Sequence, residues 1–163
     1  MPVIIRKYTP EDIPQMIRVW NEVVEDGIAF PQIECLDEKR GAEFFGSQSH
    51  CGVAENNGSG EILGLYILHP NNVGRCGHIC NASYAVTSKA RGNRIGETLV
   101  RDSIEQGKAH GFRILQFNAV VRSNTAARKL YEKLGFTPLG VIPNGFLQKN
   151  GNYVDIVPYY IEF

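Results

Sequence analysis

The spacing of apolar residues near the N-terminus predicts a strand followed by two helices. Residues 3–7 alternate and begin with β-branched side chains, and residues 9–12 resemble a helix cap with proline at the first helical position. Apolar side chains then recur at helical spacing over residues 13–24, which predicts a helix with Trp20 in the core. A second, short helix is expected over residues 36–45.

The rest of the chain alternates between strand and helix patterns. The expected elements are strands at 51–55, 62–69, 78–86 and 113–121, a helix from the Gly-containing turn at 88–96 to about residue 110, a helix at 124–134, and two strands within 137–163. This order predicts a single α/β domain over residues 1–163, with a mixed, mostly antiparallel sheet of about seven strands, flanking helices and a central βαβα unit.

Composition narrows the classes of function. The 163 residues suit one domain, and 17 basic residues balance 17 acidic ones, which argues against a nucleic-acid partner that would need clustered cations. The first residues contain charges and prolines before any apolar run long enough for a signal peptide or a membrane span. We therefore expect a cytoplasmic protein with neither a nucleic-acid nor a membrane partner.

The four cysteines favour reduced thiols rather than a disulfide framework. On a strand, Cys76, His78 and Cys80 would share one face, as three zinc ligands could. We favour the alternative that they are small residues lining a sheet, because no fourth ligand is nearby, and we expect no metal site.

Two segments combine features of ligand sites. The basic turn from Ser88 to Gly96 links a strand end to a helix, so its backbone N–H groups and the helix dipole could receive a phosphate. The second segment runs from Asn124 to Phe136. In it Asn124 can cap a helix and Tyr131, seven residues later, projects from a similar angle. Taken alone, the first segment fits an ordinary solvated loop with helix-capping glycines about as well. In the second, Tyr131 as a half-buried core aromatic and Asn124 as a plain cap are the more usual interpretation of each residue taken singly.

Together the two segments resemble the GCN5-related N-acetyltransferase (GNAT) superfamily. The first resembles its phosphate turn, Arg/Gln-x-x-Gly-x-Gly/Ala, at Arg91 and Gly96, whereas Arg94 stands where the first glycine is usual. The second matches its motif Asn-x-x-Ala-x-x-x-Tyr-x-x-x-Gly-Phe without departure. The resemblance implies an enzyme that binds acetyl-coenzyme A, with these cofactor-binding residues: Tyr84, Ala85, Val86, Arg91, Gly92, Asn93, Arg94, Ile95, Gly96, Asn118, Asn124, Ala127 and Tyr131.

The resemblance also assigns catalytic roles. Tyr131 would donate a proton to the departing thiolate of coenzyme A. Many members carry a glutamate base on the fourth strand, and Asn81 stands at that position here. Because an amide is no base, we expect Asn81 to orient the acceptor or a water while solvent or a nearby group takes the proton. His78 is close in sequence, but its odd spacing from Asn81 aims it at the opposite face, and we interpret it as a core histidine.

The acceptor is expected to be a small amine. The C-terminal segment and the apolar loop at 28–31 resemble the branch that acetylates amino acids and their analogues, such as phosphinothricin and azetidine-carboxylate acetyltransferases. The substrate-binding candidates are Phe30, Asn81, Asn118 and Phe146. The alternatives are an acetyltransferase for protein N-termini and a non-catalytic sensor of coenzyme A. The apolar tail also makes a homodimer plausible.

Overall fold

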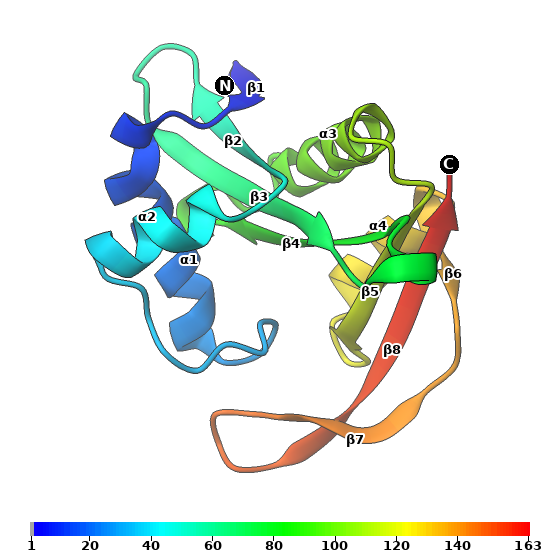
Figure 1. The fold of residues 1–163 in the computed structure, drawn as a ribbon. Helices are drawn as coiled ribbons and strands as arrows, with labels where there is room; N and C mark the ends of the chain where they lie inside the picture. The colour runs from blue at the N-terminus through cyan, green and yellow to red at the C-terminus, as the bar shows by residue number, and fades with distance from the viewer. Residues whose placement is uncertain (1) are drawn as a thin grey trace.

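The computed structural model describes residues 2–163, which form one eight-stranded sheet with helices on both faces (Figure 1). Along the chain the elements are β1 (Val3–Lys7), η1 (Pro10–Asp12), α1 (Ile13–Asp26), α2 (Glu38–Gly46), β2 (His50–Asn56), β3 (Ile62–Pro70), η2 (Gly74–Cys76), β4 (Ile79–Val86), η3 (Ser88–Ala90), α3 (Ile95–Ala109), β5 (Ile114–Val121), α4 (Thr125–Lys133), β6 (Thr137–Pro138), β7 (Ile142–Leu147) and β8 (Tyr153–Glu162). The strand order is β1-β2-β3-β4-β5-β8-β6, and β7 pairs with β8. The predicted fold class is confirmed.

Two apolar layers hold the helices on the sheet. Helices α1 and α2 cover one face, where Trp20 is 1% exposed, as the helical pattern predicts. Helix α3 covers the other face through Leu99 and Val100, and α4 adds partly buried Leu130. Figure 1 shows α1 and α2 on one side of the strands and α3 on the other. The amphipathic stripes read from the sequence are therefore the faces that the helices bury.

The sheet divides at its centre. Strands β4 and β5 form the only parallel pair in the described chain, and they are paired only at Ile79 with Ile114 and at Cys80 with Leu115. On its other edge β5 pairs with β8 from Ile114 to Val121, in a register broken between Phe117 and Val120. Because the two strands diverge, a gap in the sheet opens beside β4.

The C-terminal segment departs from expectation, because it contains three strands rather than two. The extra strand, β6, has two residues and pairs with Tyr159 and Tyr160 of β8. Strands β7 and β8 then form a long hairpin that extends from the body of the sheet (Figure 1). In the turn of this hairpin Lys149 Nζ donates a hydrogen bond to the Glu25 carbonyl oxygen at 3.0 Å, so its tip is attached to the end of α1.

The cysteine region also differs from expectation. Cys76 lies in η2 and is exposed, and the strand begins only at Ile79, so Cys76 and Cys80 do not share a strand face. His78 is exposed rather than a core residue, because it lies in the turn before β4. Within residues 2–163 there is no cluster of three or more histidine, cysteine or acidic side chains that could hold a metal. No helix in this range is both long and apolar enough to cross a bilayer.

Candidate active site

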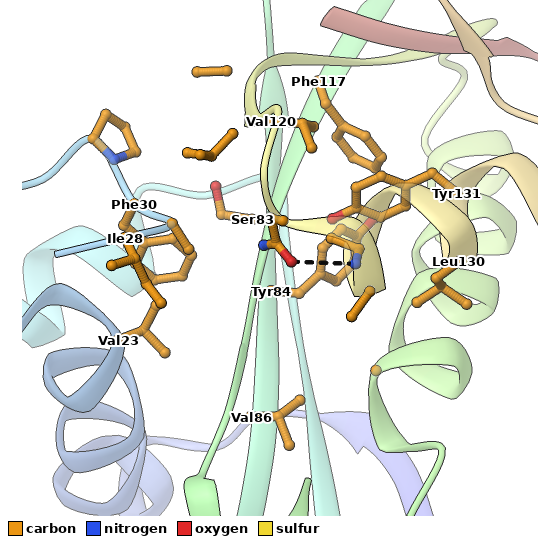
Figure 2. Close-up of a pocket in the computed structure, with 18 of the residues that line it drawn as sticks. Val23, Ile28, Phe30, Ser83, Tyr84, Val86, Phe117, Val120, Leu130 and Tyr131 are labelled. Carbon is orange, nitrogen blue, oxygen red and sulfur yellow. Dashed lines mark hydrogen bonds between the residues drawn. The ribbon is translucent and has the colours of Figure 1, made fainter. Parts of the chain in front are cut away.

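A cleft of about 790 Å³ opens where β4 and β5 diverge. One wall comes from α1 and the loop after it, with Val23, Ile28 and Phe30 (Figure 2). The other wall comes from β5 and α4, with Phe117, Val120, Leu130 and Tyr131, and the residues between the walls are Ser83, Tyr84 and Val86 of β4. The cleft therefore receives side chains from both halves of the divided sheet.

Strand β4 offers a free backbone edge to this cleft. Thr87 N donates to Leu63 O at 2.9 Å and Ile79 O accepts from Asn71 N at 2.8 Å, so the odd-numbered residues of β4 bond toward β3. Because backbone groups alternate along a strand, those of Tyr84 and Val86 point the other way. Both residues line the cleft, whereas the side chain of Ala85 is buried on the α1 side.

The basic turn after β4 leads into the N-terminus of α3. Gly92 has a φ of 83°, and Arg94 has a φ of 60° in the left-handed region. That conformation explains why the position usually holds glycine. Arg94 is the N-cap of α3 without a side-chain cap, so the N–H groups of the first helical turn remain available to an anion. Arg91 and Gly96 line the cleft. Gly92, Asn93 and Arg94 lie in the turn outside its lining, and Ile95 is the buried first residue of α3, also outside the lining.

Two acidic residues of α1 hold this turn. Asp26 pairs with Arg91 at 3.1 Å, and both residues line the cleft. Glu22 accepts hydrogen bonds from Ser88 N at 2.8 Å and from Thr87 Oγ1 at 3.0 Å, and these bonds lower the pKa of Glu22. The sequence reasoning missed both acidic residues, because each contact joins segments about 65 residues apart.

Helix α4 supplies a small-residue surface on the opposite side. Asn124 is its N-cap, and its side chain accepts from Ala127 N at 3.3 Å, which confirms the predicted cap. Ala126 and Ala127 line the cleft and leave space beside the helix. The helix thus brings Asn124 and Tyr131 to one cavity.

Tyr131 lies in a cluster of aromatic rings. Its ring centroid is 4.5 Å from that of Phe117, 5.6 Å from that of Phe136 and 5.8 Å from that of Tyr159. Burial, and secondly the Tyr159 phenol, raises the pKa of Tyr131. The phenol is therefore protonated at neutral pH. Its oxygen has no hydrogen-bond partner among residues 2–163, so it can serve a ligand in the cleft.

The two predicted amide residues also line the cleft. Asn81 lies on β4 and Asn118 on β5, and both donate to the side-chain oxygen of Asn71, at 3.4 Å and 2.7 Å. Asn71 was not predicted as a site residue. Among the cleft-lining residues of the described chain Asp26 is the only carboxylate, and it is paired with Arg91.

The two predicted aromatic residues lie in different places. Phe30 lines the cleft, is 7% exposed and packs on Trp20 with ring centroids 4.4 Å apart. Phe146 is 6% exposed and packs with Val121 and Ile156; Val121 lines the cleft, whereas Phe146 does not. From the same hairpin it is Gln148 that reaches the cleft, which only the attachment of the hairpin to α1 reveals.

Comparisons with known proteins agree with this geometry. The sequence model of the acetyltransferase (GNAT) family matches residues 16–136. N-acetyltransferase aca1 of Schizosaccharomyces pombe is 35% identical over 103 residues, which are 63% of this chain and 49% of that protein. The chain thus spans about half the length of this curated relative.

Solved structures match over nearly the whole chain. A GCN5-related N-acetyltransferase from Kribbella flavida has a TM-score of 0.89 at 30% identity and covers 99% of this chain and 98% of its own. A phosphinothricin acetyltransferase from Sinorhizobium meliloti, in complex with AcCoA, has a TM-score of 0.91 at 19% identity and covers 100% and 89%. The second likeness is one of fold alone.

Proposed function

The chain belongs to the acetyltransferase (GNAT) family, and from this premise we propose that it transfers the acetyl group of acetyl-coenzyme A directly to the amine of a small molecule. Family membership confirms the resemblance predicted from the two motifs. One observation carries the proposal: the divided sheet places a protonated tyrosine, Tyr131, and two amides, Asn81 and Asn118, in one cleft.

The cleft suits the parts of the cosubstrate in order. Backbone groups of Tyr84 and Val86 can bond the amides of the pantetheine arm, as one strand bonds another. The free N–H groups at the start of α3 can receive the pyrophosphate, with Arg91 beside them. Asn124 and Ala127 complete the surface on the opposite side.

Tyr131 is the proposed acid. The thioester supplies an activated acetyl group, and the acceptor amine replaces the thiolate on its carbonyl carbon. Tyr131 donates its proton to the departing sulfur, which leaves as a thiol. The raised pKa of Tyr131 keeps that proton in place until negative charge develops on sulfur.

The proton of the amine takes another route. Asn81 cannot accept it, and the carboxylate of Asp26 is paired with Arg91. We therefore assign Asn81 the role of orienting the amine through its amide oxygen, while solvent accepts the proton. A free alkyl amine has a pKa of about 10.4, so only its neutral fraction reacts.

Two segments that narrow one side of the cleft favour a small acceptor over a protein N-terminus. The loop after α1 contributes Ile28 and Phe30, and Gln148 approaches from the β7–β8 hairpin. The bond from Lys149 to Glu25 attaches that hairpin to α1. A peptide needs an open groove at this place. Apolar and amide groups suit an amino acid or an amino-acid analogue.

Thiol release from acetyl-coenzyme A tests the proposal. The panel contains amino acids, their analogues, polyamines and N-terminal peptides, and mass spectrometry identifies the product. Turnover with a small amine, and none with peptides, supports the proposed transfer to a small molecule. Turnover with peptides alone favours the N-terminal acetyltransferase, and binding of acetyl-coenzyme A without any turnover favours the sensor.

The proposal also includes a homodimer, located in the cytoplasm, that has neither a nucleic-acid nor a membrane partner. Exposed apolar side chains lie on β7, on β8 and in the segment before β7, and a second copy could cover them in a homodimer; they are Leu139, Val141, Ile142, Leu147 and Tyr153. The zero net charge supports neither a nucleic-acid nor a membrane-surface partner, and free cysteines suit the cytoplasm.

A further inference from the structure

Three asparagines meet at the point where β4 and β5 separate. Asn71 follows β3, and its side-chain oxygen accepts from Asn118 Nδ2 of β5 at 2.7 Å and from Asn81 Nδ2 of β4 at 3.4 Å. Its backbone N–H donates to Ile79 O at 2.8 Å, which fixes the residue against the start of β4. Direct pairing of the two strands has already ended, at Cys80 and Leu115. Asn71 thus joins the two edges just past their last pairing.

These hydrogen bonds determine which amide oxygen is free to accept a hydrogen bond from a ligand. Asn118 Oδ1 accepts from Gln116 Nε2 at 3.1 Å, and Asn71 Oδ1 already accepts two bonds. Of the three amide oxygens only Asn81 Oδ1 has no donor within residues 2–163. An amide that donates through its nitrogen has its oxygen aimed away from that partner. Asn81 therefore offers an acceptor, which suits the N–H of an amine.

We propose that Asn71 is a positioning residue, which holds Asn81 and Asn118 in the orientation that receives the acceptor amine. The proposal rests on the proposed function for its effect on turnover. Asn71 itself does not line the cleft, so it acts through the other two amides. Asn71 contains no group that titrates. Of the two cleft residues that it bonds, Asn118 was expected from the sequence to bind the cosubstrate as well as the acceptor, and the proposal assigns it to the acceptor. The other residues proposed to hold acetyl-coenzyme A have no side-chain hydrogen bond with Asn71 in the described range.

Three variants separate this role from damage to the turn. Asn71→Ala removes the oxygen that both amides share, whereas Asn71→Asp keeps an oxygen in its place. Asn72→Ala is the matched control, because Asn72 is exposed and caps only the neighbouring Val73 N, at 2.8 Å. We expect Asn71→Ala to raise the KM for the amine about tenfold, the effect of losing about one such hydrogen bond. The KM for acetyl-coenzyme A is expected to be unchanged.

Side-chain amide NMR of the free protein provides a readout that needs no turnover. In Asn71→Ala the Asn118 side-chain N–H protons are expected to exchange faster with solvent, and in Asn71→Asp they are expected to regain protection. The KM for the amine should change in parallel. It should be close to the wild-type value in Asn71→Asp and equal to it in Asn72→Ala.

The outcomes separate the two proposals. A wild type that acetylates no amine defeats the proposed function, and the exchange of Asn118 then decides the positioning role alone. Unchanged exchange in Asn71→Ala overturns the role. So does an unchanged KM for the amine in an active enzyme, or an Asn71→Asp variant no better than Asn71→Ala.

Discussion

The rings of Phe117 and Tyr131 pack with their centroids 4.5 Å apart, and this contact places the Tyr131 phenol in the cleft with its pKa raised by burial. Because the phenol is the proposed proton donor to sulfur, we expect Tyr131→Phe to lower kcat about 100-fold. The KM for acetyl-coenzyme A and the melting temperature are expected to change little, since the hydroxyl has no protein partner in the described range. Steady-state kinetics and thermal unfolding measure both.

A second tyrosine controls for the substitution itself. Tyr153, on β8, is 62% exposed and is not part of the apolar cluster that contains Tyr131. Tyr153→Phe should therefore leave kcat unchanged. Equal kcat values for Tyr131→Phe and the wild type would remove the acid role from Tyr131.

The absence of an unpaired carboxylate from the cleft lining of residues 2–163 predicts a simple pH profile. The logarithm of kcat/KM for the amine should rise with a slope of one from about pH 6 toward the pKa of the amine, because only the neutral amine reacts. Because the pKa of Tyr131 is raised, loss of its proton should not lower kcat/KM at any pH up to about 10. A region of slope two would reveal a base on the enzyme.

Arg94 predicts a stability effect that is separate from its charge. Its φ of 60° costs an L-residue about 1–2 kcal/mol, and glycine escapes most of that cost. We expect Arg94→Gly to unfold with a free energy about 1 kcal/mol higher than that of Arg94→Ala, which lacks the charge but keeps the strain. Chemical denaturation measures the difference. If alanine is equal or better, the turn is not strained.

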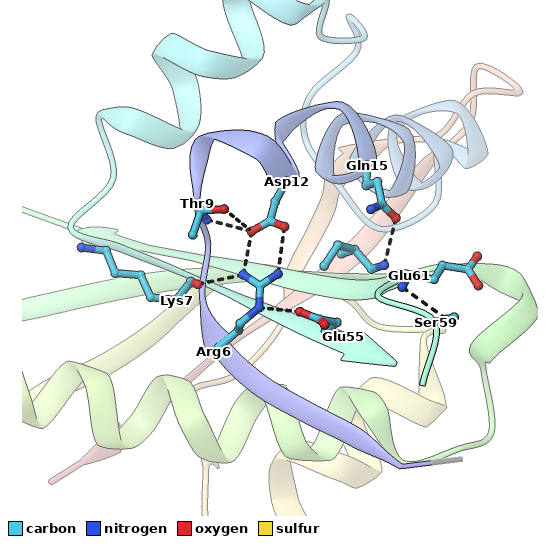
Figure 3. A network of polar contacts seen from close by, with 9 residues as sticks. Arg6, Lys7, Thr9, Asp12, Gln15, Glu55, Ser59 and Glu61 are labelled. Carbon is cyan, nitrogen blue, oxygen red and sulfur yellow. Dashed lines mark hydrogen bonds and ion pairs between the residues drawn. The ribbon is translucent and has the colours of Figure 1, made fainter. Parts of the chain in front are cut away.

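The ion pair between Arg6 and Asp12 should make the free energy of unfolding depend on pH in the acid range (Figure 3). The Arg6 guanidinium donates to both Asp12 oxygens, at 2.7 Å and 2.9 Å, and Thr9 N donates to the same carboxylate. Arg6 holds the pKa of Asp12 below its usual range. A lowered pKa stabilises the fold above the unfolded pKa of about 3.9, and this contribution disappears as the pH falls through the folded pKa.

The matching variant is Asp12→Asn. Because Arg6 is about a third exposed, we expect the free energy of unfolding to fall by only about 1–2 kcal/mol at pH 7. The difference from the wild type should shrink below about pH 4. Urea titrations at both pH values measure it, and a difference that does not change with pH would show that the ion pair does not contribute.

Local patterns predicted the parts of the fold that depend on local physics. The stripe that contains Trp20 is buried, and Asn124 caps its helix, because helical spacing and capping act over a few residues. The two-residue strand β6 escaped prediction because Pro138 is a poor strand former and the pairing depends on β8.

The site required long-range contacts that no local pattern contains. The pairing of Asp26 with Arg91 depends on how α1 crosses the sheet, and the role of Asn71 depends on where β4 and β5 separate. Phe146 and Gln148 lie on one strand and its turn, yet only Gln148 lines the cleft, because the hairpin bends toward α1. The sequence thus indicated the candidate polar residues of the cleft more fully than the contacts that form its walls.

The most direct measurement is thiol release from acetyl-coenzyme A by the wild type and by Tyr131→Phe, with each small amine of the panel in turn. We predict that at least one amine gives an acetylated product with one thiol released per acetyl group transferred, and that the rate falls about 100-fold in the variant. A wild type that binds no acetyl-coenzyme A, or that releases thiol equally with and without every amine, would contradict the account.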